Sequence, residues 1–115
     1  MNKLAIDNPS VFIRTADITI GGARINIDFR THNTTGSEQA YQLSYQFFDE
    51  HGKMVLQSKS SAGYRTTGWG PHSFSTNIFD QELWSVDHPH LYKAIINLIQ
   101  NKQIVDRYET SFGFR

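Results

Sequence analysis

Cysteine is absent from this 115-residue sequence, so neither disulfide bonds nor thiolate zinc sites can hold its fold. An excess of charge of one sign is also lacking, because 11 lysines and arginines balance 11 aspartates and glutamates. Without a basic excess the chain has no net positive field to draw it onto nucleic acid or anionic lipid. No apolar run is long enough for a transmembrane helix. These absences indicate one domain of ordinary length that depends on a hydrophobic core.

The N-terminal residues show no signal for export. Met1 to Pro9 contain one lysine but no apolar stretch of the kind found in a signal peptide. We expect residues 1–10 to be a leading segment or linker from a preceding domain, and residues 11–115 to be the folded domain. The compartment stays open, since bacterial cytoplasm and periplasm both fit. A net charge near zero lowers solubility, which favours a domain whose neighbours cover part of its surface.

Short runs of alternating apolar and polar residues recur along the chain, as in half-buried β-strands. Residues 24–30 alternate without a fault, so Ile25, Ile27 and Phe29 are expected to face a core. None of the runs keeps helical spacing over the length of a helix. The predicted strands are residues 16–20, 23–31, 40–48, 53–59, 72–79, 91–99 and 103–112.

Turn residues separate these strands. Gly21-Gly22 suits a two-residue hairpin, and Gly52 suits the left-handed position of a turn. Residues 33–37 and 64–71 are expected to be loops. In the last strand the alternation of inward-facing and outward-facing residues changes phase between Val105 and Phe112, which predicts a β-bulge. Seven short strands with regular turns predict an all-β fold, an immunoglobulin-like antiparallel β-sandwich.

The C-terminal third carries the most informative motif. It reads Leu83-Trp84-Ser85-Val86, then Pro89-His90-Leu91-Tyr92, and closes on Gly113-Phe114-Arg115. This stretch resembles the end of the immunoglobulin-like second domain of glycoside hydrolase family 2. The family has a Leu-Trp-Ser-Pro-like turn, a Pro-x-Leu-Tyr start to the next strand, and a final Gly-Phe-Arg; Val86 stands here where proline is common. Within the family the motif is most similar to that of the β-galactosidases.

The resemblance implies a fixed domain order: a sugar-binding jelly-roll domain, then this domain, then a catalytic (β/α)8 barrel. It implies that the chain is a non-catalytic spacer of an enzyme that hydrolyses terminal β-D-galactosides in carbohydrate metabolism. The partners would be the jelly-roll and barrel domains, and in some members other subunits. In some members a loop of this domain reaches a neighbouring active site, and residues 64–71 are the candidate for that here. No cofactor is expected.

The glutamates of the chain do not fit the catalytic pattern. Retaining glycosidases place two carboxylates about 5–5.5 Å apart, one as acid/base and one as nucleophile. The resemblance implies that both lie in the barrel, with the acid/base glutamate directly after an asparagine. The glutamates here are Glu38, Glu50, Glu82 and Glu109, and none follows asparagine. All four fall in predicted loops or on solvent faces, so we expect no catalytic residue in this chain.

Several residues have both a functional and a structural interpretation. His88 and His90 lie on one side of an extended segment, but no third or fourth ligand is near, so they indicate a surface turn rather than a metal site. The remaining histidines, His32, His51 and His72, are expected to be solvated. Asn33-Thr34-Thr35 matches a glycosylation acceptor, although chance explains it better. Trp69, between two glycines, is a candidate for a sugar contact, for a domain or subunit contact, or for a core anchor.

Two further predictions concern surfaces. The alternation in residues 91–99 places Ile95 and Ile99 on the outward-facing side of a core strand. An exposed apolar pair often marks a contact surface. With Phe114 and Arg115 they are the predicted interface to the barrel. The alternative function is an autonomous carbohydrate-binding or adhesion module that uses Trp69 and Tyr64 for stacking. A calcium-dependent adhesion repeat is disfavoured, because no acidic junctions are seen.

Overall fold

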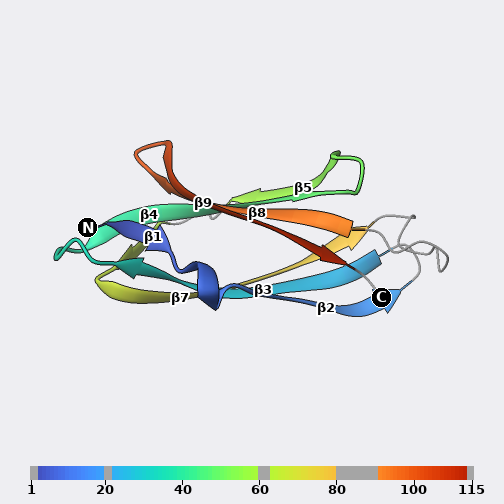
Figure 1. Ribbon diagram of the computed structural model, residues 1–115, viewed down its shortest axis with the longest axis horizontal. Helices are drawn as coiled ribbons and strands as arrows, with labels where there is room; N and C mark the ends of the chain where they lie inside the picture. Colours follow the sequence, from blue (N-terminus) through green and yellow to red (C-terminus); the bar gives the residue numbers. More distant parts are fainter. Residues whose placement is uncertain (1–2, 20–21, 60–62, 80–90, 114–115) are drawn as a thin grey trace.

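The computed structural model describes residues 3–19, 22–59, 63–79 and 91–113, which form two antiparallel sheets packed face to face (Figure 1). The first sheet contains β1 (Leu4–Ile6), β2 (Phe12–Thr19), β3 (Gly22–Asn33) and β7 (Gly68–Phe79). The second contains β4 (Gln39–Phe48), β5 (Met54–Lys59), β6 (Tyr64–Thr66), β8 (Leu91–Gln100) and β9 (Gln103–Gly113). Within those ranges no helix has the length and apolar character needed to cross a membrane. The predicted all-β sandwich is confirmed.

Each sheet has one strand that pairs with two short partners. β3 pairs with β7 along its whole length, while β1 pairs with residues 31–33 and β2 with residues 22–28. The 3-10 helix η1 (Asn8–Ser10) separates β1 from β2. In the second sheet β8 lies between β4 and β9, and β4 also pairs with β5 and, nearer its start, with β6. The long strands β3, β4 and β8 therefore form the body of the domain.

The core lies between the two sheets and contains the residues that alternation predicted. Ile25 and Ile27 are fully buried and Phe29 is 4% exposed. The facing sheet contributes Tyr41, Leu43, Tyr45 and Phe47 from β4 and Tyr92, Ala94, Ile96 and Leu98 from β8. Each fully buried isoleucine or leucine stabilises the fold by roughly 1.5–3 kcal/mol relative to an exposed one.

The N-terminal segment, predicted to be a leading segment or linker, contains β1. Its Leu4 and Ile6 are 7% and 4% exposed and belong to the core. The backbone N–H of Ile6 donates a 2.7 Å hydrogen bond to Oδ2 of Asp106 on β9. This bond joins the edge of the first sheet to the second, so residues 4–6 pack as part of the sandwich.

Residues 64–71 were expected to be a loop, and that prediction is wrong. They form β6 and the first four residues of β7, which pair with β4 and with residues 30–33 of β3. The chain changes sheets between the two strands, where Gly68 has a positive φ of 81° that glycine adopts without strain. The glycines and Pro71 hid this strand start from the sequence analysis. The predicted strand 72–79 therefore begins four residues earlier.

The turn and bulge predictions are confirmed where the structure describes them. Gly52 has a φ of 81°, and Asn101 and Lys102 form the β8–β9 turn with positive φ values of 52° and 64°. Leu98 pairs with Asp106 but Ile99 pairs with Ile104, which leaves Val105 as the extra residue of a bulge. The Gly21-Gly22 hairpin lies partly outside the described residues.

Candidate functional site

The glutamates were the first candidates for chemistry. Each of the three described ones lies beside a basic side chain: Glu38 is 3.3 Å from Arg65, Glu50 is 3.4 Å from His51, and Glu109 is 2.8 Å from Lys93. A general acid needs a raised pKa, whereas the hydrogen bond from Lys93 and then its charge lower the pKa of Glu109. Glu82 lies outside the described residues. In the described ranges no group of three or more histidines and carboxylates is placed to hold a metal ion.

Some of the predicted site residues fall outside the described ranges. These are His88, His90, Phe114 and Arg115, together with Trp84 and Pro89 of the family motif. The surface turn at the two histidines and the interface role of Phe114 and Arg115 therefore stay predictions.

Trp69 lies on the outer face of the first sheet and is 48% exposed, so the interpretation as a core anchor is wrong. His32, its direct partner on β3, stacks on the indole with ring centroids 3.7 Å apart and planes 5° from parallel. The guanidinium carbon of Arg30 lies 3.9 Å from the Trp69 ring centroid, and Arg30 Nε donates a 2.8 Å hydrogen bond to Asp7 Oδ2. Two planar groups this close to one ring centre would overlap on the same face. His32 and Arg30 therefore occupy opposite faces of the indole.

This arrangement limits what Trp69 can bind. A sugar stacks on a flat aromatic face, and both flat faces of Trp69 contact the domain's own side chains. A sugar could stack on Trp69 only if the indole left one of these two neighbours, and the sugar contact stays a prediction, as does the contact with a domain or subunit.

A polar cluster lies between the sheets at the end where the chain passes from β6 to β7. Tyr41 Oη is 2.7 Å from His72 Nε2 and 2.9 Å from Thr31 Oγ1. Burial lowers the pKa of His72 and raises the pKa of Tyr41, so both side chains are neutral near pH 7. Gly70 makes room for the cluster, since a Cβ there would lie 2.8 Å from Thr31 Oγ1. The prediction that His72 is solvated is wrong: its neutral ring is half-buried and hydrogen-bonded to Tyr41.

The candidate glycosylation acceptor is a structural residue. Asn33 is 5% exposed, and its Nδ2 donates to the backbone oxygens of Ser37 at 2.8 Å and Thr66 at 2.7 Å. Both amide hydrogens are therefore used to join β3 to the following loop and to β6. A glycan cannot attach to this nitrogen in the folded domain, so the chance match is the better explanation.

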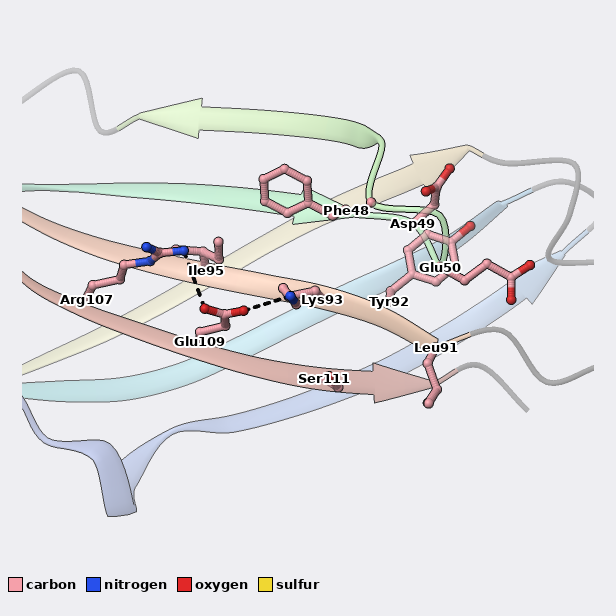
Figure 2. Close-up of a pocket in the computed structure, with 11 residues that line it drawn as sticks. Phe48, Asp49, Glu50, Leu91, Tyr92, Lys93, Ile95, Arg107, Glu109 and Ser111 are labelled. Atoms are coloured by element: carbon pink, nitrogen blue, oxygen red, sulfur yellow. Dashed lines mark hydrogen bonds and ion pairs between the residues drawn. The ribbon is translucent and has the colours of Figure 1, made fainter.

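Ile95 is 5% exposed, so the prediction that it forms an exposed pair with Ile99 is wrong. It lies on the outer face of the second sheet, in a cavity of about 480 Å³ that we call the sheet-end pocket (Figure 2). The pocket is lined by Phe48, Leu91, Tyr92, Lys93, Ile95, Arg107, Glu109 and Ser111, and by Asp49, Glu50 and Gly52 of the β4–β5 turn. Ile99 is half-buried and lines a separate hollow of about 300 Å³. The predicted apolar pair is thus divided between two hollows.

Comparisons with known proteins agree on one family. A sequence profile described as glycosyl hydrolases family 2 matches residues 5–115. A β-glucuronidase of Formosa agariphila is 21% identical over 96% of this chain, which corresponds to 11% of that protein. A β-galactosidase of Bacteroides ovatus is 21% identical over 90% of this chain and 12% of its own length. The crystal structure of a family 2 member from Bacteroides cellulosilyticus has the same fold, with a TM-score of 0.85 at 20% identity over 97% of this chain and 15% of that one.

Proposed function

Because this chain belongs to glycosyl hydrolase family 2, we propose that it is a non-catalytic spacer domain of a larger β-glycosidase. The observation that carries the proposal is the share of each relative that the chain matches. It spans only 11% and 12% of the curated relatives and 15% of the solved family member. The parent therefore has other domains, and we assign catalysis to one of them.

The geometry of the domain supports a structural role. The chain extends 51 Å along its longest axis and 24 and 22 Å along the others, so it can hold two neighbours well apart. The bond from Ile6 to Asp106 and the shared core make one unit of the two sheets. Glu38, Glu50 and Glu109 are all beside basic side chains, and the hydrogen bond from Lys93 lowers the pKa of Glu109, whereas a general acid needs a raised pKa. These properties suit a rigid spacer between a jelly-roll domain and a barrel.

The substrate of the parent is the second part of the proposal. The C-terminal motif favours terminal β-D-galactosides, while the relatives by name include a β-glucuronidase and a β-galactosidase. We propose double-displacement hydrolysis of one of these β-glycosides by two carboxylates outside this domain.

Chromogenic β-galactosides and β-glucuronides test the proposal. The parent enzyme should release the chromophore from one of them, and the 115-residue chain alone should release it from neither. Turnover by the isolated chain that is lost in Glu38→Gln or Glu109→Gln would overturn the spacer role.

A carbohydrate-binding module is the competing function, and the half-exposed Trp69 is the observation in its favour. It requires the indole to leave His32 or Arg30 when a sugar binds. Titration with galactosides and β-glucans, followed by tryptophan fluorescence, separates the two functions. Saturable binding that disappears in Trp69→Ala would favour the module.

A further inference from the structure

We propose that the sheet-end pocket docks a loop from another domain of the parent polypeptide. The loop presents an apolar side chain to Leu91 and a carboxylate to Lys93 and Arg107. This inference rests on the proposed function, because it needs a parent with further domains.

Leu91 gives the apolar part of the pocket an exposed surface. Leu91, the first residue of β8, is 63% exposed, the highest exposed fraction among the large apolar side chains of the described residues. Its cross-strand partner is Gly113, which has no side chain to cover it. Phe48 from the end of β4 and Ile95 continue the same lining (Figure 2). An apolar side chain from a neighbour can therefore lie against Leu91 without displacing a side chain of the described residues.

At the Glu109 end of the pocket two cations share one carboxylate, while the other two lining carboxylates, Asp49 and Glu50, belong to the β4–β5 turn. Glu109 lies 2.8 Å from Lys93 Nζ and 3.4 Å from Arg107 Nη2, so a single carboxylate serves two cations (Figure 2). The other carboxylates at the rim are engaged within their own turn. Asp49 Oδ1 accepts from the backbone N–H groups of His51 and Lys53. A lysine and an arginine carry more N–H donors than one carboxylate accepts, which favours an incoming carboxylate.

On the opposite outer face several of the described polar groups pair with one another. Asp28 accepts from Arg14 and from Ser73, and Asn26 accepts from Ser75. Trp69 is enclosed by Arg30 and His32. These internal pairs engage many polar groups of the first sheet, although Phe12 is 59% exposed on the same face.

A domain of the same polypeptide fits the pocket better than a separate protein. A stable interface between separate proteins buries about 1,200–2,000 Å², and one apolar and one ionic contact fall short of that. A tethered domain instead meets the pocket at a high effective concentration, so a small contact suffices. The chain corresponds to only 11–15% of its relatives, so most of the parent can supply the loop.

Hydroxyl-radical footprinting of the full-length parent tests the inference. The oxidation rate of each side chain is divided by its rate in the urea-unfolded enzyme. Leu91 and Phe12 are 63% and 59% exposed in this domain, and they lie on opposite outer faces, so Phe12 is the matched control. We expect Leu91 to be protected several-fold more than Phe12. Equal rates, or protection of Phe12 alone, would overturn the docking site.

Charge reversal provides the second arm. In the parent, Lys93→Glu should raise the Leu91 oxidation rate to that of Phe12, and the milder Lys93→Gln should raise it part of the way. Lys59→Glu on β5 makes the same charge change outside the pocket and should leave the rate unchanged. An equal response to Lys93→Glu and Lys59→Glu, or protection of Leu91 that increases with enzyme concentration, would contradict a tethered loop. The proposed function is tested separately, since turnover by the isolated chain would refute it whatever the footprint shows.

Discussion

The imidazole of His32 lies on one flat face of the Trp69 indole and is almost parallel to it, at an interplanar angle of 5°. The register of β3 and β7 sets this geometry, because the two residues are direct cross-strand partners. Arg30, two residues earlier on β3, covers the other face. The stack turns an aromatic residue that resembles a sugar platform into part of the sheet surface.

Loss of this stack should lower stability without a binding phenotype. We expect Trp69→Ala to reduce the free energy of unfolding by about 1 kcal/mol, since an exposed cation–π contact contributes about 0.5–1 kcal/mol and the ring stack adds to it. Urea unfolding followed by circular dichroism measures the change. Ser75→Ala on the same face removes one exposed hydrogen bond and serves as the control. A loss no larger than that of the control would mean that the stack does not stabilise the sheet.

Gly70 should tolerate no side chain. A Cβ there would lie 2.8 Å from Thr31 Oγ1 and 3.0 Å from Tyr41 Oη, in the buried polar cluster. Gly70→Ala should therefore destabilise the domain by about 1–3 kcal/mol, as overpacking does. The nearest neighbour of an added Cβ at Gly63 is 3.6 Å away, so Gly63→Ala is the matched control. Similar melting temperatures for the two variants would contradict the packing described here.

The half-buried His72 should make stability depend on pH. Burial lowers its pKa in the folded protein below the ordinary value of 6.5, which the unfolded chain keeps. Between the two pKa values the unfolded chain binds more protons, so the free energy of unfolding should fall as the pH drops through about 6.5 and below. Urea unfolding between pH 7.5 and 5 gives the slope. His72→Gln should flatten it, and an unchanged slope in that variant would assign the effect to other groups.

Asp106 should hold β1 in place. Its Oδ2 accepts the Ile6 N–H at 2.7 Å across the sandwich. Asp106→Ala leaves this part-buried donor without its partner, which should cost about 1–3 kcal/mol and speed hydrogen exchange at Ile6. Asp106→Asn keeps an acceptor oxygen and should exchange more slowly than the alanine variant. Equal exchange in the two variants would show that the hydrogen bond does not secure β1.

The long strands could be predicted from the sequence because their alternation is regular over many residues. Ile25, Ile27 and Phe29 and the inward sets of β4 and β8 were identified in this way, and all are buried. β1 and β6 were missed because each has only three residues, too few to show a period. The start of β7 was missed because Gly68, Gly70 and Pro71 are typical of turns.

The surface properties were harder to predict. The sequence correctly places Ile95 on the outer face of its sheet. Whether the side chain is exposed there depends on its neighbours in other strands. Its cross-strand partners are Gln46 and Glu109, and the long stems of Lys93 and Arg107 lie beside it. In the same way, the enclosure of Trp69 depends on the register that places it opposite His32. Single-sequence patterns do not contain the pairing of distant strands.

Covalent trapping of the nucleophile in the parent tests the central claim most directly. A retaining glycosidase forms a glycosyl-enzyme intermediate on a carboxylate, and a slowly hydrolysed 2-fluoro-β-glycoside leaves that residue labelled for peptide mapping by mass spectrometry. Galactosyl and glucuronyl versions of the reagent cover both substrate classes. The spacer role predicts that the label lies on a glutamate outside these 115 residues. A label on Glu38, Glu50, Glu82 or Glu109 would contradict it.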